Sequence, residues 1–103
     1  MEKCYAIKQR EINKEIERIC KDVSTESFKN IGRLRHCKAL VFESTNYYVL
    51  QSYSTDIAVI DKRTGILYDC LRMVYGYTAT SAQHIAKFRQ DYCAKSTLTW
   101  REV

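Results

Sequence analysis

The sequence contains no proline and only three glycines among its 103 residues. Without proline there is no linker signal, and three glycines leave little material for a phosphate-binding loop. G-x-G-x-x-G, P-loop, H-E-x-x-H and G-x-S-x-G motifs are also missing. We therefore expect one domain over residues 1–103 that has no enzymatic activity, with a helical part over about 1–34 and a sheet plus a C-terminal helix over about 38–103.

Long apolar runs are missing too. No stretch approaches the ~20 residues that a membrane-spanning helix needs, and the first twenty residues carry charge where a signal peptide has an apolar core. The composition, 46% hydrophobic and 28% charged, is that of folded chains. We expect a cytoplasmic protein with no membrane partner.

The five cysteines are an odd number and include no C-x-x-C pair, which argues against a disulfide framework or a zinc knuckle. We expect free thiols, no cofactor and no bound metal. The alternative is a metal site assembled in space from His36, Cys37, His84 and Cys93, although no two of these have zinc-site spacing.

Residues 2–23 have the pattern of an amphipathic helix. Its apolar stripe consists of Tyr5, Ile12, Ile16, Ile19 and Val23, and charges of alternating sign occupy the other face. Packing of this stripe on the domain's own sheet is the favoured interpretation, and pairing with a second copy is the alternative, so monomer and homodimer both stay open. Phe28, Ile31 and Leu34, spaced by three, then predict a second short helix that ends near Gly32.

A sheet is expected from Ala39 onward. The runs KALVFE and YYVLQSY should pair as a hairpin, and TDIAVID, apolar on both faces, suits a central strand. We expect a break around Ser54 and Thr55, because one strand from Tyr47 to Asp61 would be unusually long. The turn DKRTG should then return ILYDC antiparallel to DIAVI, with Gly65 at positive φ.

The last third of the chain predicts a helix and a strand. Thr80 and Gln83 have the spacing of a capping box, and Ala82, Ile85, Phe88 and Tyr92 form the apolar stripe behind it. Leu98, Trp100 and Val103 alternate in the final segment. The predicted fold class is α+β, with an antiparallel sheet of about four strands flanked by an N-terminal and a C-terminal helix.

The net charge of +5 suits nucleic acid or an acidic protein surface. No acidic residue occurs from Lys29 to Phe42, and the basic residues of that stretch are Lys29, Arg33, Arg35 and Lys38, with His36 among them. These four cations are the candidate nucleic-acid-binding residues, through phosphate contacts to RNA or DNA. The competing interpretation is a solvated connection between helix and sheet.

Eight tyrosines are a further oddity. Most suit the core or its edge, whereas Tyr75 and Tyr77, which alternate before the C-terminal helix, are expected to be exposed. His84 borders the helix stripe. A structural hydrogen bond is favoured for it over contact with a ligand.

Two segments, LQSYSTDIAVIDKRTGILY and YGYTATSAQHIAKF, resemble a domain family encoded in phages and integrated elements of Gram-positive bacteria. The family pattern S-Y-x-T is matched by Ser52, Tyr53 and Thr55. Its Y-S-x-T-T-x-x-H-I pattern is matched at Tyr77, Thr80, His84 and Ile85, followed by Phe88, with departures at Thr78 and Ser81. The resemblance covers roughly residues 50–92 and leaves out the N-terminal helix and the basic connection.

That resemblance implies a non-catalytic protein from mobile DNA, most simply an anti-CRISPR protein that binds an RNA-guided CRISPR effector nuclease or its guide complex. The expected partner-binding residues are Tyr75, Tyr77, Thr80 and His84. Because the effector channel is itself positive, a basic protein is a poor nucleic-acid mimic for it, so a different surface or the guide RNA should be involved. The alternative function is a small basic nucleic-acid-binding accessory protein of the element.

Overall fold

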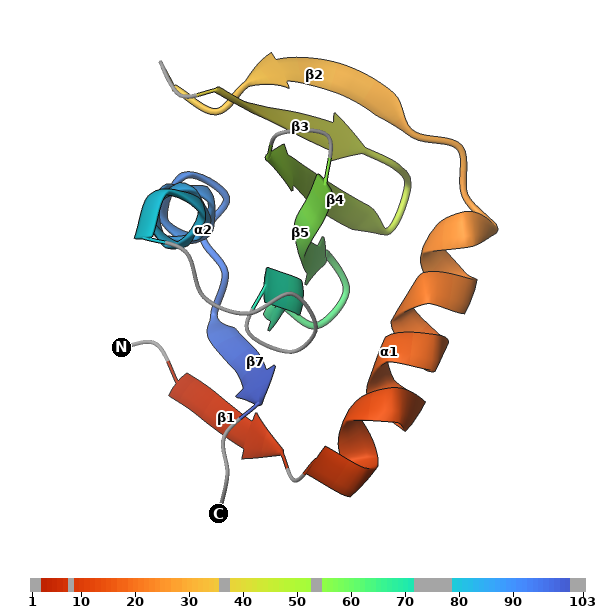
Figure 1. Cartoon of the computed structure of the whole chain (residues 1–103). Helices are drawn as coiled ribbons and strands as arrows, with labels where there is room; N and C mark the ends of the chain where they lie inside the picture. Colours follow the sequence, from red (N-terminus) through yellow and green to blue (C-terminus); the bar gives the residue numbers. More distant parts are fainter. Residues whose placement is uncertain (1–2, 8, 36–37, 53–54, 72–78, 101–103) are drawn as a thin grey trace.

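The computed structural model describes residues 3–7, 9–35, 38–52, 55–71 and 79–100. In this part of the chain one seven-stranded sheet, ordered β1-β7-β6-β5-β4-β3-β2, lies between two helices (Figure 1). The elements are β1 (Lys3–Ile7), α1 (Gln9–Ser24), β2 (Lys29–Arg33), β3 (Ala39–Glu43), β4 (Tyr47–Ser52), β5 (Thr55–Asp61), β6 (Ile66–Asp69), α2 (Ala79–Asp91) and β7 (Ser96–Trp100). The α+β class with two helices is as predicted. None of the described helices is both long and apolar enough to cross a membrane.

The sheet is larger than predicted and it is mixed. Strand β7 runs parallel to both of its neighbours, β1 and β6, while the other pairs are antiparallel. The prediction of about four antiparallel strands missed β1 and β2, which form the two edges. Helix α2 connects β6 to β7 as a crossover. It returns the chain to the end of the sheet where β6 began, and β7 therefore runs parallel to β6.

The central strands are where the sequence predicts them. Leu50 pairs with Val41 on one side and with Ala58 on the other, so β3, β4 and β5 form the expected meander. Strand β4 ends at Ser52 and β5 begins at Thr55, which confirms the break. Strand β6 returns antiparallel to β5, and Gly65 in the connecting turn has φ +77°. That conformation is accessible to glycine at little cost.

The N-terminal part differs from the prediction. Residues 3–7 form strand β1, not the first turns of a helix, because they pair with β7 at the far end of the sequence. The short helix predicted after Ser24 is also wrong, since β2 occupies that segment and pairs with β3. Phe28 packs on the α1 face and Leu34 on the α2 face, while Ile31 is exposed. The spacing by three therefore does not mark one buried face.

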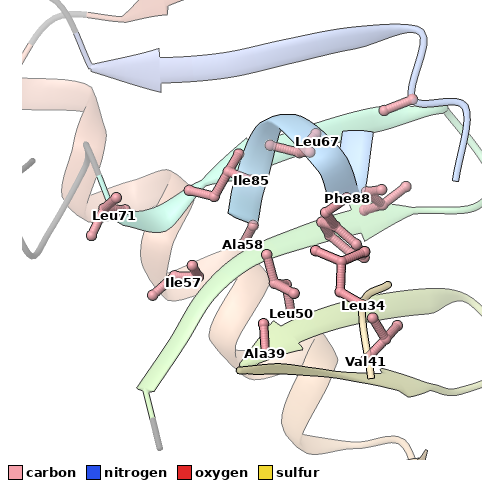
Figure 2. Close-up of a cluster of buried hydrophobic side chains, with 12 residues drawn as sticks. Leu34, Ala39, Val41, Leu50, Ile57, Ala58, Leu67, Leu71, Ile85 and Phe88 are labelled. Atoms are coloured by element: carbon pink, nitrogen blue, oxygen red, sulfur yellow. The ribbon is translucent and has the colours of Figure 1, made fainter. Parts of the chain in front are cut away.

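Each face of the sheet carries its own core. Twelve buried residues pack beneath α2, among them Leu50, Ile57, Ile85 and Phe88 (Figure 2). On the α1 face, Ile19 is buried with Tyr47, Val49, Val59 and Tyr68, and Val23 packs against them. These contacts of Ile19 and Val23 match the favoured interpretation of the N-terminal stripe. Because β5 is covered on both faces of the sheet, it is apolar at every position from Ile57 to Ile60.

Helix α2 buries the predicted stripe but begins earlier than predicted. Ile85 and Phe88 are buried, and Ala82 and Tyr92 pack against the same cluster. Since the helix starts at Ala79, Thr80 occupies its first turn and does not precede it as an N-cap. The capping-box prediction is therefore wrong in register.

A buried polar network fastens α1 to the sheet. The hydroxyl of Tyr47 donates to Asp22 Oδ2 at 3.0 Å and accepts from the Arg63 guanidinium at 2.8 Å. Arg63 in turn binds the buried carboxylate of Asp61. Burial and the bond to Asp22 raise the pKa of Tyr47 to about 12. The neutral phenol is thus held as a bridge between the helix and the β5–β6 turn.

Candidate functional site: a basic sheet edge

Strand β2 exposes every one of its five residues. It lies at the edge of the sheet, where β3 is its neighbour and neither helix covers it (Figure 1). Ile31 is 41% exposed, which is unusual for so large an apolar side chain in a strand. This edge and the connection that follows it carry the four cations predicted to bind nucleic acid, and we call Lys29, Arg33, Arg35 and Lys38 the basic edge.

A β-bulge shapes the strand. The register against β3 shifts between Asn30 and Gly32, which leaves Ile31 as the extra residue. The side-chain oxygen of Asn30 accepts the N–H of Gly32 at 2.8 Å, and Gly32 has φ +117°, a conformation open to glycine alone at low cost. Bulges and charged side chains prevent strand addition at an edge. The basic edge therefore offers its side chains, and not its backbone, to a partner.

All four cations are exposed, but they differ in their surroundings. Lys29 faces Glu43 across the β2–β3 pair. The pKa of that carboxyl is lowered by the bond from Lys62 and, to a smaller extent, by Lys29. Arg33 and Lys38 are exposed and form no ion pair with any residue that the structure describes. These two are the cations best placed to meet phosphates.

Arg35 is held differently. Its guanidinium binds both carboxylate oxygens of Asp91, at 2.6 to 3.0 Å, and also reaches the side chain of Gln90 at 3.2 Å. The bond from Arg35 lowers the pKa of Asp91. Arg35 thus ties the β2–β3 connection to the end of α2, and one carboxylate already neutralises its charge. Its partner lies 56 residues away, and nothing in the local sequence announces it.

Of the predicted partner-binding residues, the structure describes Thr80 and His84. Tyr75 and Tyr77 lie outside the described residues. Thr80 is exposed in the first turn of α2, whereas His84, one turn later, is 6% exposed. His84 Nδ1 and the hydroxyl of Ser52 are 3.1 Å apart, so a hydrogen bond joins α2 to the end of β4. Burial and, to a lesser degree, the charge of Lys87 lower the pKa of His84, so the imidazole is neutral at pH 7.

Metal-binding groups are not assembled within the described ranges, where no three His, Cys, Asp or Glu side chains come close enough to hold an ion. Of the proposed alternative set, His36 and Cys37 lie outside those ranges. Cys20, Cys70 and Cys93 are free thiols. Burial raises the pKa of Cys70 to about 12, which makes it unreactive.

Two features that the sequence analysis did not single out belong to the molecule's polar surface. Tyr48 and Tyr92, from β4 and the end of α2, have ring centroids 4.5 Å apart beside a pocket. Lys62 lies over the Tyr48 ring at 4.5 Å and binds Glu43. The sequence shows that tyrosine is abundant, but only the fold shows that these two tyrosines are paired.

These features define a class: a small α+β domain whose mixed sheet lies between two helices and ends in an exposed, bulged, cationic strand. Within that class the chain belongs to DUF8033, a family of unknown function whose family model matches residues 20–102. The match runs from the middle of α1 through β7. It includes the basic edge, which the resemblance noted over residues 50–92 had left out. Comparison with curated proteins and with solved structures gave no significant match.

Proposed function

We propose that this protein is a non-catalytic binding protein of a phage or mobile element that contacts nucleic acid through its basic edge. The observation that carries the proposal is the exposure of all five residues of β2, with Arg33 at its end and Lys38 beyond it in a stretch without acidic residues. Lysine and arginine side chains neutralise phosphates and release counterions, which supplies affinity without sequence recognition. The bulge leaves these side chains, and not the strand backbone, as the contact groups.

The target we propose is the guide complex of an RNA-guided CRISPR effector, so that the protein acts as an anti-CRISPR inhibitor. The resemblance to phage-encoded domains supports this choice of target, and the cationic edge suits the exposed parts of a guide RNA. The positive channel of such an effector would repel a chain of net charge +5. Contact with the RNA avoids that repulsion.

The second candidate is an accessory protein that binds RNA or DNA of the element itself. The same edge favours it, because phosphate contacts from Arg33 and Lys38 do not depend on sequence. The two candidates differ in what is retained. An inhibitor holds the effector together with its guide, whereas an accessory protein holds nucleic acid alone.

The experiment is a pull-down of tagged protein from host lysate, with and without nuclease, followed by a cleavage assay with the purified effector. The test variant is Arg33→Ala with Lys38→Ala. The control, Lys14→Ala with Lys21→Ala, removes the same charge from exposed positions of α1. We expect the test variant to lose both retention of its target and inhibition of cleavage. The slope of log affinity against log salt concentration should fall by about two. The control should keep all three properties.

Retention of the effector by both variants alike would contradict a role for the basic edge. Recovery of nucleic acid alone, lost on digestion, would reject the inhibitor and favour the accessory protein. If neither nucleic acid nor effector is retained by the folded protein, both candidates fail.

A further inference from the structure

A pocket of about 310 Å³ lies on the α2 side of the sheet. It is bounded by Tyr48 of β4, the turn between β5 and β6, and the end of α2 with the loop that follows it. Its volume is at the lower end of the range for small-molecule sites. The pocket takes no part in the function proposed above.

One wall of the pocket is aromatic. The rings of Tyr48 and Tyr92 are tilted by 48° with centroids 4.5 Å apart, and both side chains are partly exposed. Tyr92 also packs against the buried ring of Phe88 at 5.3 Å, so the core holds it in place. A ring fixed in this way can stack with a nucleic-acid base at little entropic cost.

The rim of the pocket is cationic. Lys95 is exposed, and its backbone N–H donates to the carbonyl of Gly65 at 2.8 Å. Its aliphatic stem passes over Gly65 so closely that a methyl group there would meet it at 3.0 Å. The missing side chain at Gly65 therefore leaves room for the stem of Lys95. Lys95 forms no ion pair with any described residue.

Lys62, also in the lining, is already paired. Its ammonium binds Glu43 and the carbonyl of Ser44, both at 2.7 Å, and lies over the ring of Tyr48. Because these contacts occupy Lys62, direct contact with an anion falls to Lys95. The acidic residue of the lining, Asp61, is paired with Arg63 and does not offset Lys95.

We infer that this pocket binds a nucleoside phosphate, with the base against the tyrosine pair and the phosphate at Lys95. An aromatic wall together with a cationic rim suits a ligand that is flat at one end and anionic at the other. Free nucleotides and the nucleotides of a single strand share that chemistry, and the experiment separates them.

The test is isothermal titration of the folded protein with AMP, UMP, ribose 5-phosphate and inorganic phosphate. Lys95→Ala is the test variant, and Lys14→Ala, which removes an exposed lysine of α1, is the matched control. We expect the two nucleotides to bind at least about tenfold more tightly than ribose 5-phosphate, because stacking on the tyrosines is lost without a base. Lys95→Ala should weaken nucleotide binding by about tenfold, and Lys14→Ala should leave it unchanged.

A ribotetranucleotide forms the second arm. Tighter binding than AMP with the same loss in Lys95→Ala supports a site for single-stranded nucleic acid, and equal binding supports a site for free nucleotide. The inference is overturned if the wild type binds no nucleotide at millimolar concentration. It is also overturned if ribose 5-phosphate binds as tightly as AMP, or if Lys95→Ala binds as well as the wild type.

Discussion

His84 has two interpretations in the sequence, a structural hydrogen bond or contact with a ligand, and its burial bears on which one applies. In the sequence it belongs both to the family-like pattern and to the border of a helix stripe. In the structure it is buried and bonded to Ser52, which supports the structural role that the sequence analysis favoured. A neutral imidazole in that position contributes to stability in a way that depends on pH.

The pH dependence has a definite sign. The folded-state pKa of His84 lies below the ordinary histidine pKa of 6.5, and the unfolded chain should titrate near that value. The stabilisation is therefore complete above about pH 6.5 and is lost as the pH falls through the lower folded-state pKa. Urea denaturation from about pH 7.5 to about pH 5 should show this loss in the wild type and a flatter profile in His84→Gln.

His36→Gln is the control for that profile, because it removes the other histidine of the chain. It should keep the wild-type dependence. Equal slopes for the wild type and His84→Gln would contradict the assignment of the pH dependence to His84.

At the scale of elements, β2 is the strand that most needs protection. Its free edge carries a bulge at Ile31 and the cations Lys29 and Arg33, devices that prevent pairing with another chain. The same cations are the proposed contacts for nucleic acid. The side chains that keep another strand from pairing with this edge are thus the same ones that are proposed to attract phosphate.

Replacing both cations of the strand with β-branched apolar residues should allow the edge to pair with another molecule of the protein. We expect Lys29→Ile with Arg33→Val to self-associate at concentrations where the wild type does not, as measured by light scattering. Lys14→Ile with Lys21→Val adds comparable apolar surface to α1 and should scatter like the wild type. Unchanged scattering of the β2 variant would show that the bulge alone protects the edge.

The elements that the sequence predicts correctly are those held by local contacts. Strands β3 to β6 are joined by short turns, and Gly65 and the alternation of apolar residues mark them. Strands β1 and β2 depend on partners that the local pattern does not reveal. In β2, a glycine and an exposed isoleucine gave a false helical spacing, because spacing alone does not tell which residues share a buried face.

The candidate site divides in the same way. The absence of acidic residues from Lys29 to Phe42 is visible in the sequence, and it predicts the cationic character of the edge. The engagement of Arg35 by Asp91 is a contact between β2–β3 and α2 that only the fold produces. The tyrosine pair at the pocket also depends on the fold, because Tyr48 and Tyr92 are 44 residues apart in the sequence.

At the scale of the whole molecule, stability rests on two cores that share one thin sheet. Phe88, on the inward face of α2, is fully buried in the larger cluster (Figure 2). Phe88→Ala should cost about 3–5 kcal/mol in the free energy of unfolding, because it leaves a cavity. That is a large share of the ~5–15 kcal/mol typical of a domain.

Denaturant unfolding followed by circular dichroism measures this cost. Gln83→Ala, at an exposed position of the same helix, should change the free energy of unfolding by no more than about 0.5 kcal/mol. A cost below about 1 kcal/mol for Phe88→Ala would contradict the central position of this side chain in the core.

Strands β1 and β2 follow one another in the sequence but lie at opposite edges of the sheet, joined by α1 across one face (Figure 1). During synthesis the residues of β1 leave the ribosome first, yet their pairing partner, β7, is made last. The hairpins from β3 to β6 close small loops and are expected to form early, whereas β1 must wait for a contact of high sequence separation. Of the seven strands of this sheet, β1 is therefore expected to be the last to join it.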